Sequence, residues 1–220
     1  MSDDRKRLFL CLPLYGSMVH VRVAMRFFRA QSKMVEVHPM LSQSSLLARG
    51  FNCNWIQAQN EGFDYFLMLH GDVEPQPSDW VDILLKEMQD HQADIISAVV
   101  PIKDDSGRTS TAIGNPTNPW LRTHLMLSNC HDLPRTFGTA ELGKPDHSLL
   151  VNTGCMLVDL SMPWVRDVHF TIRDRINDGV VECEPEDWYF SRRAWEIGAK
   201  VMATRAVPVI HHGEHEYRSW

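Results

Sequence analysis

The chain has 220 residues, 44% of them hydrophobic and 23% charged, which is an ordinary composition for a soluble globular protein. This length suits one large domain or two small ones and is sufficient to bury a sizeable core. The formal net charge of −6 argues against broad nonspecific binding to nucleic acid, although it leaves room for a local basic groove.

Cysteine usage and hydropathy bear on where the protein works. The five cysteines stand singly, no C-x-x-C pair occurs and their number is odd, so we expect free thiols in a reducing compartment. The sequence shows no N-terminal targeting signal, and no apolar run approaches the length of a membrane span. These features predict a cytoplasmic protein without a membrane-spanning segment.

The first hundred residues alternate between patterns typical of strands and of helices. In chain order, the patterns predict a strand over 7–16 that ends at Pro13, a helix over 17–33, a strand over 34–41, a helix over 42–62, a strand over 65–69, a helix over 77–91 capped by Ser78 and a strand over 93–102. Such alternation predicts an α/β fold with a mostly parallel sheet and helices on both faces. Because ligands of these sheets bind beyond the carboxyl ends of the strands, we expect residues 13–15, 70–72 and 101–103 to meet in one crevice.

The second half of the chain begins with a change of pattern. Residues 103–147 are rich in Asp, Ser, Thr, Gly, Asn and Pro, which predicts long loops or a small excursion such as a lid or an acceptor wall. Strands return over 148–160, around Gly154, and a helix is predicted over 184–198. Two short strands then close the chain.

The predicted strand at 65–69 ends in an unusual mixture of residues, His70-Gly71-Asp72, and Glu74 follows closely. A carboxylate at a strand end is a suitable ligand for Mg²⁺ or Mn²⁺, which often take only one or two carboxylates and complete their shell with phosphates. We therefore predict that Asp72 binds a metal ion. We rank Glu74 lower, and the alternative is that Asp72 is a turn residue that caps the next helix.

Two further clusters carry candidate chemistry. The segment "IHHGEHEY" (210–217) holds three histidines, and imidazole is a common metal ligand, but the spacing does not match a structural zinc site. The alternative is a solvated tail. Glu186 and Asp187 open a predicted helix, where acids are favoured by the helix dipole, but a carboxylate held there is also well placed to act as a general base.

Five segments of the chain, in the order in which they occur, resemble segments of the glycosyltransferases of the GT-A fold. Among these, the family-2-like enzymes are the most similar, including compact ones of phages and large viruses. The resemblance runs from about residue 8 to 215. It rests on "LPLYG", "SLLARGFN", "FLMLHGDVEP", "NTGCMLV" and "PEDWYFSRRAWEIGAKV" followed by "VPVIHHG". It implies a single GT-A-type, Rossmann-like domain with a nucleotide-sugar-binding half (about 8–102) and an acceptor-binding, catalytic half (about 103–215).

The resemblance also assigns roles to residues. The resemblance implies that the protein transfers a sugar from a nucleoside-diphosphate sugar, with a UDP-sugar favoured, and that the transfer inverts the sugar carbon. It also implies that the reaction depends on Mn²⁺ or Mg²⁺ as cofactor. Asp72 and His211 would hold the metal, with His212 and His215 as weaker candidates. Asp187 would be the general base, and Glu186 would help to bind the acceptor. The family usually has Asp at both ends of its D-x-D motif, whereas His70 stands at the first position here, so His70 would ligate the metal or bond the sugar nucleotide.

Other candidates are single residues, and for each of them packing or a surface position is an alternative. The predicted donor-binding residues are Pro13, Tyr15, Arg49, His70, Gly71, Asp72 and Lys103. The predicted acceptor-binding residues are Trp120, Gly154 and Trp188.

Two other functions stay open. The chain would be a catalytically inactive module that binds a sugar nucleotide or a glycan if the missing first Asp abolishes turnover. It would be a nucleotidyltransferase if the same sheet and metal serve transfer of the nucleotide. The sequence leaves the acceptor open as well: a glycan, a protein side chain or a modified nucleic-acid base.

Overall fold

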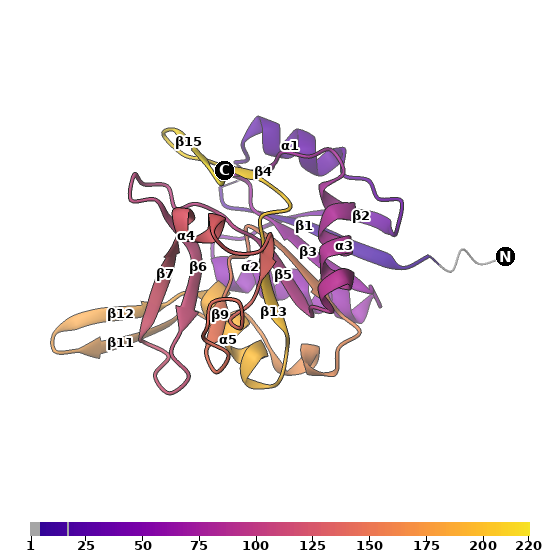
Figure 1. Ribbon diagram of the computed structural model, residues 1–220. Coiled ribbons are helices and arrows are strands. Elements are labelled where there is room, and N and C mark those ends of the chain that lie inside the picture. The colour runs from indigo at the N-terminus through magenta and orange to yellow at the C-terminus, as the bar shows by residue number, and fades with distance from the viewer. Residues whose placement is uncertain (1–4, 17) are drawn as a thin grey trace.

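The computed structural model describes residues 5–16 and 18–220, and a seven-stranded sheet lies at its centre (Figure 1). In spatial order the strands are β2 (Glu36–Gln43), β1 (Arg7–Leu14), β3 (Tyr65–Leu69), β10 (Cys155–Asp159), β5 (Ile95–Ala98), β13 (Val201–Thr204) and β8 (Thr136–Phe137). Strand β1 pairs in parallel with β2 and β3, and β13 pairs in parallel with β5. Strand β10 enters antiparallel between β3 and β5, and β8 is antiparallel at the edge. The predicted α/β fold with a mostly parallel sheet is confirmed.

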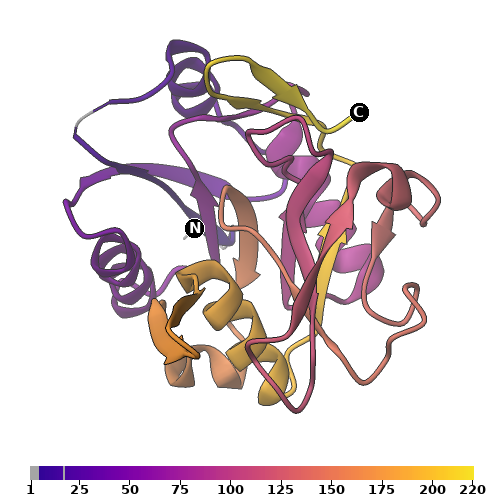
Figure 2. The same ribbon diagram turned by 90° about the vertical axis from the view of Figure 1, so that its left-hand side faces the viewer.

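Helices cover both faces of this sheet because its strands are apolar on both sides. Alternate residues of β1 belong to two separate cores: Phe9 and Cys11 to one, Leu8, Leu10 and Leu12 to the other. The first core is closed by α2 (Leu47–Asn60) and α5 (Glu186–Glu196), which lie close together in Figure 2. The second core is closed by α1 (Val21–Phe28) and α3 (Trp80–His91). The near-continuous apolar runs of the sequence are therefore those of a sheet buried on both faces.

Helix α3 starts later than the sequence predicts. Its N-cap is Asp79, not Ser78, and no side chain caps it. Ser78 lies one residue outside the position from which a hydroxyl reaches the free amides of the first turn. The first-turn carboxylate of Asp82 instead accepts hydrogen bonds from Ser32 and from the backbone amide of Lys33 at 3.1 Å, which ties the helix to the loop before β2.

The stretch 103–147 is more regular than predicted. Strands β6 (Arg108–Gly114), β7 (Arg122–Met126) and β9 (Ser148–Leu150) form an antiparallel sheet in the order β7-β6-β9, and helix α4 (Leu127–His131) follows β7. The inward positions of β6 include Thr109 and Thr111, so polar residues hide the strand pattern. The buried hydroxyl of Thr109 donates to the Leu125 carbonyl at 2.9 Å, which makes its burial tolerable.

Several short elements complete the fold, and of these the sequence predicts only the strand at 209–212, one of the two short strands that close the chain. Strands β4 (Val73–Pro75), β14 (Val209–His212) and β15 (Glu216–Arg218) form a small sheet, β11 (Arg173–Asn177) and β12 (Val180–Glu184) form a hairpin, and Pro163–Asp167 form a 3₁₀ turn. The pairing of β14 with β4 places His211 opposite Val73, immediately beside Asp72. No helix within residues 5–16 and 18–220 is long and apolar enough to cross a membrane.

Candidate functional site

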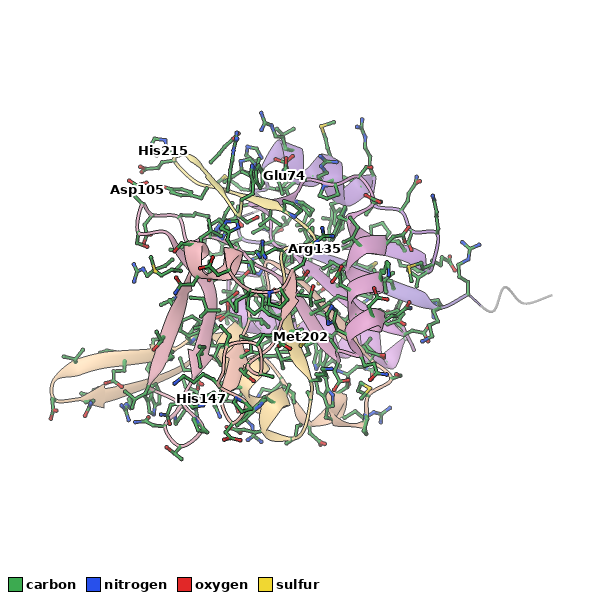
Figure 3. The ribbon with its side chains drawn as sticks, viewed as in Figure 1. Glu74, Asp105, Arg135, His147, Met202 and His215 are labelled. Carbon is green, nitrogen blue, oxygen red and sulfur yellow. The ribbon has the colours of Figure 1, made fainter. Side chains whose placement is uncertain are left out.

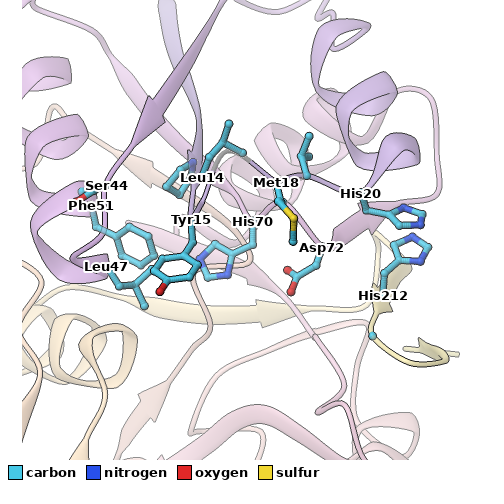
Figure 4. A pocket seen from close by; sticks show the side chains of 15 residues that line it. Leu14, Tyr15, Met18, His20, Ser44, Leu47, Phe51, His70, Asp72 and His212 are labelled. Atoms are coloured by element: carbon cyan, nitrogen blue, oxygen red, sulfur yellow. The ribbon is translucent and has the colours of Figure 1, made fainter.

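The ends of β1 and β3 open into a cavity of about 540 Å³, drawn in Figure 4. Pro13, Leu14 and Tyr15 line it from the end of β1, and residues 70–72 line it from the end of β3. From beyond β5, the ammonium group of Lys103 contacts the Asp72 carboxylate. The three strand ends predicted to share one crevice therefore meet, and the volume is typical of a site for a small ligand.

The remaining walls of the cavity are mostly apolar. One turn of α2 presents Leu47, Gly50 and Phe51, which are spaced three and four residues apart and so share a helix face. Gly50 has no room for a side chain, because a Cβ there would lie 2.9 Å from the Cβ of Ser44. The opposite wall comes from residues 18–20. The result is a slot with mostly apolar walls, in which the Asp72 carboxylate lies between His70 and the rings of His20 and His212 (Figure 4).

Asp72 is the best-placed anionic ligand in the cavity. Its Oδ2 contacts the Lys103 ammonium and lies 3.6 Å from Nε2 of His211, and 39% of its side chain is exposed. Burial acts to raise the pKa of Asp72, but hydrogen bonds from His211 and Lys103 outweigh burial and hold this pKa well below its usual range. Asp72 is therefore a carboxylate throughout the neutral pH range.

His211 is held in the orientation that a metal ligand needs. Its Nδ1 lies 2.7 Å from the carbonyl oxygen of Pro101, so Nδ1–H donates to that carbonyl and Nε2 faces Asp72. Among residues 5–16 and 18–220 no three His, Cys, Asp or Glu side chains are grouped so as to hold a metal ion. The chemistry of Asp72 and His211, a carboxylate and an imidazole, nevertheless fits an Mg²⁺-like ion, which commonly takes its other ligands from phosphates and water.

His70 stands beside Asp72 but is engaged elsewhere. Its Nε2 lies 3.0 Å from the hydroxyl of Thr153, and its ring packs against Phe51 with centroids 5.4 Å apart. Burial lowers the pKa of His70 to about 4, so the imidazole is neutral at pH 7. The backbone amide of His70 also donates to the Gly154 carbonyl at 2.9 Å. In this arrangement His70 forms part of the cavity wall, and its Nε2 is not free for a metal.

The other candidate metal ligands near residues 70–72 are Glu74, His212 and His215. Glu74 is buried, its Oε2 lies 2.9 Å from Nε2 of His212, and the His20 ring stacks on His212 with centroids 3.6 Å apart. His215 lies at the exposed tip of the β14–β15 hairpin (Figure 3). Glu74 and His212 thus contact each other, whereas the side chain of His215 is exposed.

Asp187 occupies the first turn of α5 and is buried. Its Oδ1 accepts the backbone amide of Trp188 at 2.7 Å, and its Oδ2 lies 3.5 Å from the side-chain nitrogen of Asn152. Burial and the nearby charge of Glu186 raise the pKa of Asp187 to about 8, and burial also raises the pKa of Glu186. A carboxylate with a pKa near neutrality, aimed from a rigid helix start, is suited to take a proton.

The segment 152–154 connects His70, which lines the cavity, with Asp187 at the start of α5. Asn152 contacts Asp187, Thr153 contacts His70, and Gly154 is tightly enclosed. A Cβ at Gly154 would lie 2.4 Å from Oδ1 of Asn152 and 3.0 Å from Cγ2 of Val73. The position therefore requires glycine, and the sequence prediction placed Gly154 at the site without identifying Asn152 or Thr153.

We expect Gly154→Ala to lower the free energy of unfolding by about 1–3 kcal/mol, because the added methyl group has no space unless Asn152 turns away from Asp187. Urea denaturation measures this change. Gly71→Ala is the matched control, since its Cβ would make only ordinary contacts, the nearest at 3.5 Å. An unchanged unfolding midpoint for Gly154→Ala would mean that Asn152 can move at no cost.

Three residues that the sequence analysis assigned to the site either lie away from the cavity or have side chains that pack against other residues. Arg49 is exposed on the outer side of α2, because it lies two residues from both Leu47 and Phe51 and so on the opposite helix face. The ring of Trp120 lies under the guanidinium groups of Arg173 and Arg175. Trp188 is buried in a small core, and its Nε1 donates to the Ser110 carbonyl at 2.9 Å, so it is a packing residue and has no free face for a sugar.

Comparison with models of known families and with curated proteins finds no match. The solved structures that are similar in fold include the following two. The protein A197 from STIV has a TM-score of 0.50 and 12% identity, over 94% of this chain and 86% of that one. TarS 1–349 from S. aureus, in complex with UDP-GlcNAc, has a TM-score of 0.50 and 10% identity, over 90% of this chain and 56% of that one, so this chain spans little more than half of TarS 1–349. At such identities the likeness concerns the fold alone, and this chain has a GT-A-like α/β fold.

Proposed function

We propose that this protein is a glycosyltransferase that moves a sugar from a nucleoside-diphosphate sugar to an acceptor hydroxyl. The observation that carries the proposal is the pairing of two carboxylates of opposite character around segment 152–154. The pKa of Asp72, which lines the cavity, is held well below its usual range, and Asp187 is buried with its pKa raised to about 8. Asp72 is suited to bind a cation, and Asp187 is suited to accept a proton. Sugar transfer from a nucleoside diphosphate requires both.

The donor would lie along the apolar slot. Tyr15, Leu47 and Phe51 offer flat and aliphatic surfaces to a base and ribose, and the diphosphate would then reach Asp72 (Figure 4). The similar structure of TarS 1–349 was solved with UDP-GlcNAc, which is consistent with a UDP-sugar as donor. The neutral His70 would replace an acid in contacting the ribose, and it would do so without adding charge.

Asp72 and His211 would hold Mn²⁺ or Mg²⁺ together with the donor phosphates. The cation would neutralise the negative charge that builds on the departing diphosphate. Within the chain, the Pro101 carbonyl keeps Nε2 of His211 aimed at Asp72, so the two ligands are already oriented before the ion binds.

Asp187 would accept the proton of the acceptor hydroxyl as its oxygen attacks the anomeric carbon. The glycosidic bond forms from the hydroxyl oxygen, the bond to the diphosphate breaks, and the diphosphate leaves with the electron pair. Attack opposite the leaving group inverts the sugar carbon. Asn152 would keep the carboxylate of Asp187 in position, and Glu186 would help to bind the acceptor.

Product analysis tests this proposal. The protein is incubated with a panel of nucleotide-sugars, Mn²⁺ and candidate acceptors, namely glycans, peptides and modified nucleic-acid bases. Release of nucleoside diphosphate together with a glycosylated acceptor supports sugar transfer. Release of pyrophosphate from a nucleoside triphosphate and a sugar phosphate would instead identify a nucleotidyltransferase. Nucleotide binding without turnover on any acceptor would identify a binding module.

We expect His211→Ala to raise the Mn²⁺ concentration needed for half-maximal activity by about tenfold or more, because the variant loses a direct ligand. His215→Ala is the matched control, since this exposed histidine lies four residues further along the same hairpin. Titration of activity against Mn²⁺ measures both. Equal effects, or a larger effect at His215, would mean that His211 is not the ligand.

A further inference from the structure

Lys103 and His211 converge on the same oxygen of Asp72. The Lys103 ammonium contacts Oδ2, and His211 Nε2 lies 3.6 Å from that oxygen. Oδ2 is thus the atom that a metal ion bridging Asp72 and His211 would need. A cation of the chain itself, Lys103, pairs with this oxygen.

The path of the Lys103 side chain is shaped by its surroundings. A Cβ at Gly213 would lie 3.1 Å from Cδ of Lys103 and 3.3 Å from Cε2 of Tyr217, so the lysine stem runs closely past a glycine. Gly213 also lines the donor cavity. The stem of Lys103 therefore lies against the backbone at the cavity wall, and its ammonium group ends a flexible four-carbon chain.

An ammonium group and a divalent cation cannot share Oδ2 at contact distance. At a separation of 4 Å their repulsion is about 2 kcal/mol even at the dielectric constant of water. A displaced ammonium group would stay near the cavity mouth because its stem is held there. The strongest new partner available to it is the diphosphate of the donor.

We propose that Lys103 takes the place of the metal ion while none is bound, an inference that rests on the proposed function. In this place-holding role Lys103 neutralises Asp72, moves away when a divalent cation binds, and then contacts the donor diphosphate. The device avoids an uncompensated carboxylate in the empty cavity. It also makes metal binding weak until the donor arrives to receive the released ammonium group. Binding of metal and donor is thereby coupled.

Lys103→Met tests the exchange, because methionine keeps much of the stem and removes the charge. Without nucleotide, titration with MnCl₂ followed by electron paramagnetic resonance measures the affinity of the free protein for Mn²⁺. We expect about fivefold tighter binding in the variant, in line with the loss of one partly exposed ion pair. With saturating Mn²⁺, calorimetry with UDP is expected to show about tenfold weaker nucleotide binding, because one charge-assisted contact is lost.

Lys86→Met is the matched control, since Lys86 also pairs with an aspartate, Asp90 at 2.5 Å, but on an exposed helix face. Neither affinity is expected to change in it. Equal Mn²⁺ affinity in Lys103→Met and wild type would overturn the place-holding role, and unchanged UDP affinity would overturn the contact with the diphosphate. UDP binding of equal strength with Mn²⁺ and with EDTA, lost in Lys103→Met, would show that Lys103 permanently replaces the metal and would overturn the exchange.

Failure of the proposed function gives a different pattern. In that case wild-type protein binds no UDP with or without Mn²⁺ and transfers no sugar. The Mn²⁺ titrations of the nucleotide-free proteins still report whether Lys103 competes for Asp72.

Discussion

Asp187→Asn is expected to lower kcat for sugar transfer by about 10²–10⁴-fold, the range that general-base assistance supplies. Asparagine has the size of aspartate and can still accept the Trp188 amide hydrogen bond, so the start of α5 is expected to stay folded. It cannot take the proton of the acceptor. Because Asp187 does not line the donor cavity, the Kd for UDP is expected to change by less than about threefold, which corresponds to under 1 kcal/mol.

A transfer assay and calorimetry with UDP measure these two quantities. Asp79→Asn is the matched control, since it removes a carboxylate from the start of α3, which lies outside the cavity. A wild-type rate in Asp187→Asn would place the base elsewhere and leave the helix dipole as the reason for the acid. Loss of UDP binding along with activity would assign Asp187 to the donor site.

The same residue predicts how activity depends on pH. With its pKa raised to about 8, most of Asp187 is protonated at pH 7 and cannot act as a base. We therefore expect kcat of the wild-type protein to rise with pH and to level off above about pH 8. A rate that is flat between pH 6 and 9 would contradict the assignment of Asp187 as the base.

Stability follows the opposite trend. The pKa of Asp187 is higher in the folded protein than in the unfolded chain, so the folded state holds the proton more tightly. The stability linked to this proton is present below about pH 4 and is lost as pH rises toward 8. Asparagine does not titrate, so thermal unfolding of Asp187→Asn is expected to vary less with pH in this window than that of the wild type.

Asp72→Ala is expected to abolish the metal-dependent part of the stabilisation by UDP. In wild-type protein, ligand at 100 times its Kd raises the free energy of unfolding by about 2.7 kcal/mol. Without the Asp72 carboxylate, His211 alone remains of the proposed pair of ligands, and the contribution of Mn²⁺ is expected to vanish. Melting curves with UDP, measured with Mn²⁺ and with EDTA, give the difference directly.

Asp104→Ala serves as the control for this experiment, because Asp104 pairs with Arg108 in the exposed loop close to Lys103. It removes a nearby carboxylate without touching the cavity and is expected to leave the Mn²⁺ contribution unchanged. If the Mn²⁺-dependent shift survives in Asp72→Ala, the ion is bound elsewhere or is not bound through this strand end.

The sequence by itself determined the layers of the fold and the edge at which the site lies. Apolar runs such as 65–69 are typical of strands buried on both faces, and the helices between them favour strands that run in the same direction. The ends of such strands lie along one edge, so Asp72 and the neighbourhood of Tyr15 and Lys103 follow from local pattern alone. The start of α5 at Glu186 was also visible locally, because proline and acids mark it.

Only the tertiary structure decided which of these groups touch. Lys103 meets Asp72 across 31 residues, Asn152 meets Asp187 across 35 and His211 meets the Pro101 carbonyl across 110. Such contacts depend on how β14 pairs with β4 and how segment 152–154 enters the sheet, and no local periodicity specifies this. The same holds for the pKa of Asp187, since burial by distant elements raises it, whereas a carboxylate at an exposed helix start would keep an ordinary value.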